Sequence, residues 1–481
     1  MIRTIWETLL FIHSIVHYDH VATRTPAQVD QLQISLFRRM LRHAYRHSPF
    51  YRKKLQGLDL RTCLPQDVPI LTKQEMMENY DDLVTDPRIK RKDLEAFVKD
   101  VSNVGKFYLN KYAVCLTSGS QGQPAIVVQD RAALRTLFAM QAARGHSLPK
   151  TWSEFFKRIT VRKRWVIFLL RPGFFPSSSA FHYMPKGMKR FANLTVIHLN
   201  QPFEKIVEQL NEIKPNFITA YVHVLENLAR AQQRGELKLL ESRQLELLTS
   251  ISEPLYPESR ELIEGVFGLK VSNHYAMGEC MGLTLGDPTT GGARLNKDLA
   301  VLEVCDEHNR PVPDGQPGRK VLLTNLYNYT QPIIRYEIDD IVTVQKPSGP
   351  NPTMPVIQAI AGRNNDRMCI RRNGEEVEIP VFVFAASFHP IFDLAEFQVR
   401  RDQPDHFEIW LQPLPGKTLD LDEIRRSLNA KLRQEKLEDY VRFDFKVVEH
   451  IGADPKTGKR RRYINLLKNG DAATENAPSS N

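Results

Sequence analysis

A run of small and hydroxyl-bearing residues early in the chain has the composition of a phosphate-binding loop. It is Thr117-Ser-Gly-Ser-Gln-Gly-Gln-Pro124, and it lies between two apolar segments, residues 112–116 and 125–128. This order predicts a strand, a polar loop and a second strand. The glycines allow a tight turn and a close approach of the backbone, so that N–H groups and hydroxyls can surround a polyphosphate. A plain turn is the alternative, since neither G-x-x-x-x-G-K-[ST] nor G-x-G-x-x-G occurs.

Four further segments combine charged or aromatic residues with glycine or proline, and they follow the loop in chain order. They are Tyr275-Ala-Met-Gly-Glu279, Pro332-Ile-Ile-Arg-Tyr-Glu-Ile-Asp-Asp340, Gly362-Arg-Asn-Asn-Asp-Arg-Met-Cys-Ile-Arg-Arg-Asn-Gly374 and Pro455-Lys-Thr-Gly-Lys459. With the loop, they resemble the five signature motifs of the adenylate-forming superfamily, which contains acyl-coenzyme A synthetases, peptide-synthetase adenylation domains and luciferases. The resemblance extends from about residue 30 to residue 468.

Three other segments narrow the resemblance to phenylacetate–coenzyme A ligase and its relatives linked to capsule biosynthesis. They are Arg42-His-Ala-Tyr-Arg-His-Ser-Pro-Phe-Tyr51, Pro69-Ile-Leu-Thr-Lys73 and Asn296-Lys-Asp-Leu-Ala-Val-Leu-Glu-Val304. This resemblance implies an ATP-dependent, AMP-forming ligase that activates a carboxylic acid as an acyl-adenylate and passes it to coenzyme A. Such a reaction depends on alignment and charge neutralisation more than on covalent catalysis.

Three alternatives stay open at this point. The acceptor of the acyl group could be an amine or a carrier-protein thiol, which would make the protein an amide ligase or an adenylation enzyme. The activated group could be an oxygen acid other than a carboxylate. A degenerate nucleotide-binding or membrane-surface protein is the non-enzymatic interpretation.

The resemblance assigns ATP, Mg²⁺ and catalysis to named positions. The loop would hold the β- and γ-phosphates, Asp340 would accept the ribose hydroxyls, and Glu279 would bind Mg²⁺, which suits one or two carboxylates and phosphate oxygens. Lys459 would bridge the substrate carboxylate and the α-phosphate. The residues implied for the nucleotide are Thr117, Ser118, Gly119, Ser120, Gly122, Ser252, Glu253, Pro254, Tyr275, Asp340 and Arg363.

The acid-binding pocket is expected at two segments, residues 221–224 and 274–277. Aromatic and histidine side chains there indicate a flat, aryl acid, although a purely structural hydrogen-bonding role for the first histidine is an equal alternative. The residues implied for the acid are Tyr221, His223, His274, Ala276 and Met277.

The chain departs from the superfamily pattern in its motifs. Gln123 and Ala125 flank Pro124 where many members have a lysine, and Gly278 occupies a position that is usually serine or threonine. Asp339 replaces a glycine, and Asn365 replaces the usual hinge aspartate. Rotation of a C-terminal lid about residue 365, the family's way of separating two half-reactions, is therefore a hypothesis for this chain.

The length of 481 residues favours two domains, and 42% hydrophobic with 25% charged residues is typical of a globular protein. No apolar run approaches the ~20 residues of a membrane span, and residues 2–18 are expected to form an amphipathic helix that packs on the large domain, with membrane-surface docking as the alternative. A net charge of +10, dispersed along the chain without a nucleic-acid-binding motif, predicts no nucleic-acid partner. The oligomeric state cannot be predicted.

The cysteines are odd in number, scattered and without metal-binding spacing, which favours a reduced, cytoplasmic setting without structural zinc. They are Cys63, Cys115, Cys280, Cys305 and Cys369.

The alternation of apolar segments predicts an α/β fold with largely parallel strands in a large N-terminal domain, a small β-subdomain at residues 293–344, and a small α+β lid. We expect an ATP- and acid-binding domain at 1–361, a mobile lid at 362–469 and a disordered tail at 470–481. Expected helices lie at 27–56, 203–213, 223–234 and 257–267, and expected strands at 166–170, 217–220 and 245–250. In the lid, strand, helix and strand are expected at 407–411, 421–433 and 442–448.

Overall fold

A computed structural model describes most of the chain. The described residues are 2–117, 124–145, 163–169, 173–185, 188–189, 193–199, 201–288, 290–345, 354–363, 368–372, 375–379, 382–388, 391, 393–414, 416–452 and 462–467. Ser118, Gly119, Ser120, Gly122, Asn365, Lys459 and the tail at 470–481 lie outside them. Contacts divide the chain into two compact units, one of residues 1–255 and 259–361 and one of residues 256–258 and 362–481.

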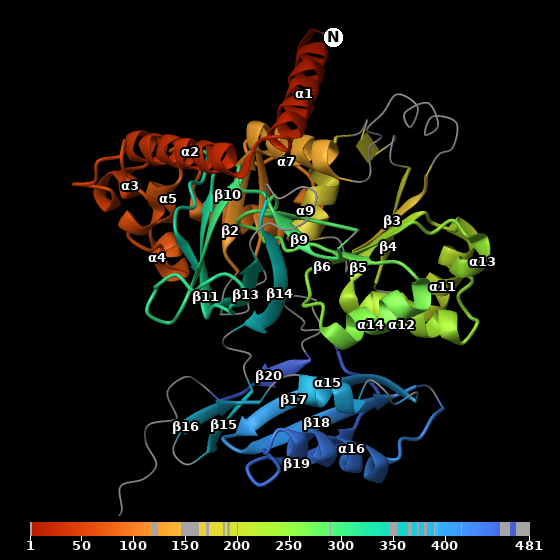
Figure 1. The fold of residues 1–481 in the computed structure, drawn as a ribbon. Coiled ribbons are helices and arrows are strands. Elements are labelled where there is room, and N and C mark those ends of the chain that lie inside the picture. Colours follow the sequence, from red (N-terminus) through yellow and green to blue (C-terminus); the bar gives the residue numbers. More distant parts are fainter. Residues whose placement is uncertain are drawn as a thin grey trace, which may run out of the picture. The chain divides into compact units, whose positions relative to one another are not determined.

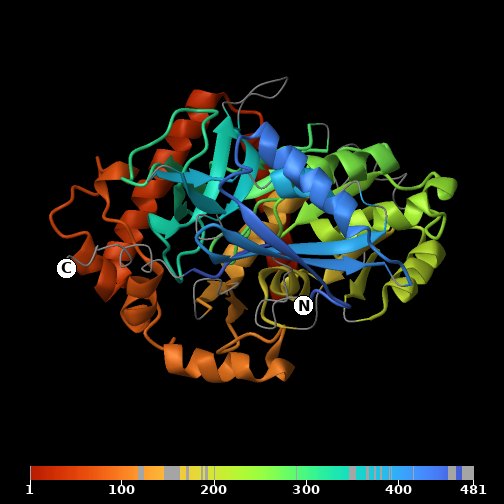
Figure 2. The same cartoon turned by 90° about the horizontal axis from the view of Figure 1, so that it is seen from below.

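A five-stranded parallel sheet organises one half of the first unit (Figure 1). Its strand order is β4-β3-β5-β6-β7. Helices α11, α12 and α14 pack on it and share its apolar core (Figure 2). This confirms the predicted α/β fold. The elements are β3 Trp165–Leu169, β4 Leu194–His198, α11 Phe203–Ile213, β5 Phe217–Tyr221, α12 Val222–Gln233, α13 Leu239–Ser242, β6 Leu247–Ile251, α14 Pro257–Phe267 and β7 Val271–Asn273.

The two strands predicted on either side of the loop are confirmed as an antiparallel pair, β1 (Tyr112–Leu116) and β2 (Ile126–Asp130), whereas residues 118–123 of the loop lie outside the described residues. Buried amide side chains bind the backbone of β2. Asn328 Nδ2 donates to the Val128 carbonyl at 2.9 Å, and Gln331 accepts from Val128 N at 2.8 Å and donates to the Ile126 carbonyl at 3.1 Å. These bonds satisfy backbone groups of β2 that would otherwise be buried without partners.

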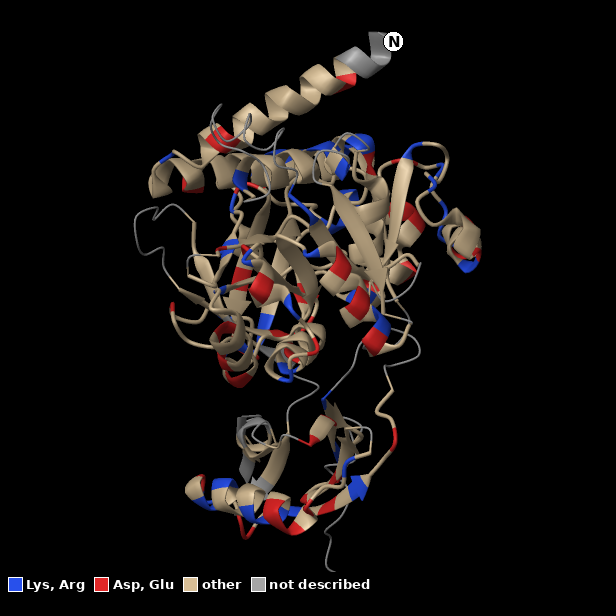
Figure 3. Cartoon of the chain, turned by 90° about the vertical axis from the view of Figure 1, so that its right-hand side faces the viewer, with Lys and Arg blue, Asp and Glu red and all other residues tan. Residues whose placement is uncertain are grey.

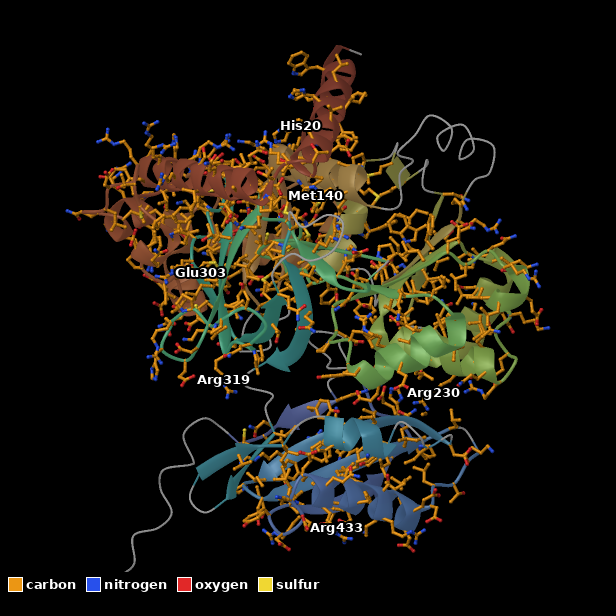
Figure 4. The ribbon with its side chains drawn as sticks, viewed as in Figure 1. His20, Met140, Arg230, Glu303, Arg319 and Arg433 are labelled. Atoms are coloured by element: carbon orange, nitrogen blue, oxygen red, sulfur yellow. The ribbon has the colours of Figure 1, made fainter. Side chains whose placement is uncertain are left out.

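Antiparallel strands form the remainder of the first unit's sheet structure, as the strand-rich pattern at 293–344 predicts. One sheet has the order β10-β11-β12, and the other has the order β13-β14-β9-β8. Glu303 of β10, labelled in Figure 4, forms an ion pair of 3.2 Å with Arg335 Nε. The strands are β8 Thr284–Gly286, β9 Ala293–Leu295, β10 Ala300–Cys305, β11 Lys320–Asn325, β12 Tyr336–Ile338, β13 Asp340–Gln345 and β14 Val356–Arg363.

The prediction of a single helix at 27–56 is wrong, because the chain forms two helices there. Helix α2 ends at His47 and α3 begins at Pro49. Ser48 between them is extended, with φ −116° and ψ 117°, since a residue before proline avoids the helical region. Its hydroxyl then caps α3 by accepting from Tyr51 N at 3.2 Å. The helices outside the parallel sheet are α1 Ile2–Val21, α2 Pro26–His47, α3 Pro49–Lys54, α4 Lys73–Glu78, α5 Tyr80–Leu83, α6 Arg91–Lys99, α7 Arg131–Arg144 and α9 Pro176–Tyr183.

The second unit has a mixed sheet of order β19-β18-β17-β20 and its own apolar core. The Asp420 side chain caps α16 by accepting from two backbone N–H groups. The strand, helix and strand expected near 407, 421 and 442 are confirmed. The elements are β15 Cys369–Arg372, β16 Glu375–Glu378, α15 Phe382–Phe388, β17 Leu394–Gln403, β18 His406–Pro413, α16 Leu421–Gln434, β19 Arg442–Val447 and β20 Tyr463–Asn465.

Candidate active site

Thr117 joins the two strand ends that border the candidate phosphate loop. Its backbone N donates to the Ala125 carbonyl at 2.9 Å, and its hydroxyl oxygen accepts from Ala125 N at 3.0 Å. The two bonds hold the ends of β1 and β2 together on either side of the loop. The loop therefore starts and ends at a fixed point, which is what preorganised binding of a polyphosphate needs.

Gly278 lies close to Thr117 and to Cys115 at the end of β1. A Cβ atom at Gly278 would be 3.1 Å from Thr117 Cγ2, 3.2 Å from Cys115 Sγ and 3.5 Å from Pro176 Cγ. The space that a serine or threonine side chain would take is thus already bordered by Cys115 of β1, by Thr117 directly after it and by Pro176 of α9. The departure from the superfamily pattern at Gly278 has a local physical cause.

Glu279 follows Gly278 and is 7% exposed. Burial, and after it the charge of Glu279, raises the pKa of the Cys115 thiol. Cys115 Sγ lies 3.9 Å from the carbonyl of Gly278, the residue before Glu279. Asn325 Nδ2 donates to the Glu279 carbonyl at 2.8 Å and fixes its backbone. Within the part of the chain that the structure describes, no group of three or more His, Cys, Asp or Glu could hold a metal on its own.

Tyr275 and Asp340 are joined by a 2.7 Å hydrogen bond from the tyrosine hydroxyl to Oδ2 of the carboxylate. The backbone of Tyr275 is held by Thr284, whose hydroxyl accepts from Tyr275 N at 2.9 Å and donates to its carbonyl at 2.8 Å. Asp340 is the first residue of β13. Two residues implied for the nucleotide, 65 positions apart, are therefore in contact.

His223 and Glu253 form a second pair, at the carboxyl ends of β5 and β6. Glu253 accepts from His223 N at 3.0 Å and binds Nδ1 of the ring at 2.8 Å. The carboxylate thus caps the first turn of α12, where a negative charge is favourable. Because the carboxylate accepts, we assign a proton to Nδ1 of the ring.

Tyr221 connects this pair to the phosphate loop. Its ring lies 5.9 Å from that of His223, and its hydroxyl is 3.5 Å from Ser177 Oγ. Burial raises the pKa of Tyr221 to about 12, so the phenol is neutral at physiological pH. Ser177 follows Pro176, the neighbour of Gly278, at the start of α9. The residues implied for the acid and those implied for ATP are therefore linked by one chain of contacts.

The other residues implied for the acid lie after β7. His274 N donates to the Ser250 carbonyl at 3.0 Å, and the His274 ring approaches the α-carbon of Gly286 closely enough that a Cβ there would be 2.7 Å away. Ala276 is exposed, and Met277 is partly buried against the core.

Sequence reasoning missed several residues that support the site. Cys115, Pro176 and Ser177 fill the space between the motifs, and Asn325, Asn328 and Gln331 bind backbone groups around the hairpin. The available signal was the three amides of Asn325-Leu-Tyr-Asn-Tyr-Thr-Gln331 directly before an apolar motif. Of the remaining residues implied for the nucleotide, Ser252 has a left-handed backbone, with φ +66°, Pro254 follows Glu253, and Arg363 ends β14.

Comparisons with known proteins find similar sequences and similar folds. No family model matches the chain. The phenylacetate-coenzyme A ligase of Escherichia coli K12 is 24% identical over 371 residues, which cover 73% of this chain and 75% of that protein. Protein CapK of Staphylococcus aureus is 22% identical over 455 residues, 91% of this chain and 89% of CapK. A solved structure of 2-hydroxyisobutyryl-CoA ligase in the postadenylation state has the same fold, with a TM-score of 0.68, 21% identity and coverage of 92% of this chain and 90% of that one. These likenesses support the adenylate-forming superfamily, and within it the branch of the phenylacetate–coenzyme A ligases and CapK.

Proposed function

We propose that this protein is an ATP-dependent, AMP-forming ligase that activates an aryl carboxylic acid and transfers it to coenzyme A. The observation that carries the proposal is the contact between motifs far apart in sequence. Gly278 touches Thr117, and Tyr275 donates to Asp340, so the phosphate, glutamate and aspartate motifs meet at one place. Matches to phenylacetate–coenzyme A ligases over about three quarters of the chain support the acid and the acceptor.

Each nucleotide-facing residue then has a defined task. Thr117 and the loop after it hold the β- and γ-phosphates, and Asp340 accepts hydrogen bonds from the ribose hydroxyls in an orientation that Tyr275 fixes. Ser252, Glu253 and Pro254 border the adenine, and Arg363 joins the ribose. A single buried carboxylate such as Glu279 fits Mg²⁺, which keeps several waters and shares oxygens with substrate phosphates. When bound, Mg²⁺ supplies charge neutralisation for the departing pyrophosphate.

The acid is proposed to lie between the two clusters of contacts. The neutral ring of Tyr221 would border the aryl group, and the His223 ring beside it is held in one orientation by Glu253. His274, Ala276 and Met277 complete the pocket. A preorganised aromatic wall favours a flat substrate over a flexible one, because less conformational freedom is lost on binding.

The second unit is proposed to act as a mobile lid. Lys459 would bridge the substrate carboxylate and the α-phosphate during adenylation, and rotation about residues 362–365 would withdraw it and admit coenzyme A. Residues 1–361 would bind ATP and the acid throughout.

The test is acid-dependent release of pyrophosphate from ATP, measured over a panel of aryl and fatty acids with and without coenzyme A. Release that requires an aryl acid, with a coenzyme A thioester as product, is the expected result. Release of pyrophosphate without a coenzyme A thioester would indicate that the acceptor is an amine or a carrier protein. ATP binding without release for any acid in the panel would contradict the proposal.

A further inference from the structure

Helix α1 presents an exposed row of large apolar side chains, which we call the α1 stripe. It consists of Trp6, Leu9, Ile12 and Val16, spaced three and four residues apart on one face of the helix. Their exposed fractions are 61%, 54%, 51% and 62%. No Lys, Arg, Asp or Glu occurs between Glu7 and Asp19, and Figure 3 shows this length of helix without charge.

The opposite face of α1 anchors the helix to the first unit. Phe11 and Tyr18 pack against the large core cluster, and α1 runs along α7. Arg144 of α7 donates to the Tyr18 carbonyl at 3.3 Å and forms a 2.6 Å ion pair with Asp298. The helix projects from its anchored end, near His20, toward the N-terminus (Figures 1 and 4). Because one face is fixed, the stripe is held outward.

Much of the net positive charge of the chain lies in one segment near the N-terminus. Residues 24–54, which contain α2 and α3, have eight Lys and Arg and one Asp, a net charge of +7 out of +10. The guanidinium groups of Arg38, Arg39 and Arg52 bind neutral oxygens, so these bonds do not cancel their charge. Lys54, in contrast, is neutralised by a 2.7 Å ion pair with Glu75. Helices α1 and α2 lie at the same end of the unit (Figure 1). A projecting apolar face therefore lies at the same end of the unit as a cationic helix, since α2 itself has four Arg and one Asp.

These features distinguish between the surfaces that could cover the stripe. Four side chains with these exposed fractions present on the order of 400 Å² of apolar surface. Pairing two copies through this face would bury roughly 800 Å² in total, below the ~1,200 Å² at which stable interfaces begin. Two cationic α2 helices would also repel each other in such a pair. An anionic bilayer satisfies both requirements, since it accepts apolar side chains including tryptophan and attracts Arg and Lys.

We propose that the α1 stripe inserts into the interfacial region of an anionic lipid bilayer while the basic α2–α3 segment binds the headgroups. The attachment is peripheral, since none of the helices in the described residues has the length and hydropathy of a membrane span. This inference concerns a surface that the proposed reaction does not use, so it stands whether or not that reaction is found.

The first test is flotation of the full chain with vesicles of phosphatidylcholine alone or with 30 mol% phosphatidylglycerol, roughly the range of anionic membranes. We expect flotation with the anionic vesicles only, weakening as salt rises because headgroup attraction is screened. The variant Leu9→Ser/Ile12→Ser/Val16→Ser should lose at least about tenfold in partitioning, in line with the apolar area removed. Arg39→Glu/Arg46→Glu should lose a similar amount.

A matched control carries the same chemical change elsewhere. Val101 is 60% exposed on an element remote in sequence from α1, so Val101→Ser should float like the unaltered protein. The second measurement is the fluorescence of Trp6, obtained as the difference between the unaltered protein and Trp6→Phe. A blue shift on addition of anionic vesicles is expected if the stripe enters the bilayer interface.

Three results would overturn the proposal. The first is no flotation with anionic vesicles at low salt. The second is flotation that the stripe variant leaves unchanged, without a shift in Trp6 emission, which would mean that charge alone binds the vesicles. The third is a dimer by light scattering that the stripe variant converts to a monomer, which would assign the stripe to a second copy.

Discussion

The Tyr275 hydroxyl donates a hydrogen bond of 2.7 Å to Oδ2 of Asp340, and Tyr275 is only 7% exposed. The phenol thereby fixes the direction of a carboxylate that is proposed to receive the ribose hydroxyls. Thr284 fixes the backbone of Tyr275 in turn through two hydrogen bonds. The geometry of the ribose acceptor thus depends on a residue that itself belongs to a different motif.

Replacing Tyr275 by Phe should weaken ATP binding. A hydrogen bond to a charged group contributes about 1.5–3 kcal/mol, so we expect a roughly 10- to 100-fold rise in the KM for ATP. Tyr51→Phe is the control, because Tyr51 is also buried and its hydroxyl donates to the Pro332 carbonyl at 2.9 Å. It should lower the melting temperature without altering the KM. Equal KM values for the two variants would remove Tyr275 from the ribose site.

The sequence was informative wherever a structure depends on local pattern. Helices α11 and α14 have the predicted boundaries, because their apolar residues recur at helical spacing between buried strands. The break at Ser48 was also encoded locally, by the proline after it. Contacts such as Gly278 with Cys115, or Gln331 with β2, join residues 163 to more than 200 positions apart. Periodicity and propensity carry no information about such pairs, so the space around Gly278 could not be predicted.

Introducing serine at Gly278 should destabilise the protein instead of restoring a missing hydroxyl. A Cβ there would be 3.1 Å from Thr117 Cγ2 and 3.2 Å from Cys115 Sγ, and overpacking of this kind costs about 1–3 kcal/mol. Adding Cys115→Ala should recover part of the loss, since the two positions share one space. Gly265→Ala is the control, because nothing lies within 4 Å of its added methyl group. Denaturant unfolding compares these three variants and Cys115→Ala alone with the unaltered protein. Additive effects of the 278 and 115 substitutions would refute the shared packing.

Replacing Glu279 by Gln should raise the Mg²⁺ concentration needed for half-maximal pyrophosphate release. The amide retains the shape of the side chain but removes the charge that a hard cation prefers. We expect a shift of at least about tenfold, as for the loss of roughly 1.4 kcal/mol of binding free energy. ATP titrations at saturating Mg²⁺ separate this effect from lost nucleotide affinity. Identical Mg²⁺ dependence in both proteins would exclude Glu279 from the metal site.

Removing the carboxylate of Glu253 should destabilise the start of α12. Glu253→Ala leaves His223 N without its acceptor at 3.0 Å, and loss of such a cap costs about 1–2 kcal/mol. Glu253→Gln can still accept from His223 N, so its melting temperature should lie between those of the other two proteins. If the alanine variant melted at the temperature of the unaltered protein, the cap would have no energetic role.

The stability of the β1 region should depend on pH through Asp86. The Arg88 guanidinium, and after it the Tyr112 hydroxyl, holds the pKa of the Asp86 carboxyl below its ordinary value of 3.8, although burial opposes this. A lowered carboxyl pKa adds stability that is complete above pH 4 and is lost as the pH falls through the lowered value. Asp86→Asn should therefore cost about 1–2 kcal/mol at pH 7, and the difference from the unaltered protein should shrink toward pH 2. Tyr112→Phe should produce a part of the same change, because Tyr112 begins β1 and binds the same carboxylate. Urea unfolding from pH 7 to pH 2 tests this, and parallel stability curves for the unaltered protein and Asp86→Asn would show that Asp86 does not link folding to pH.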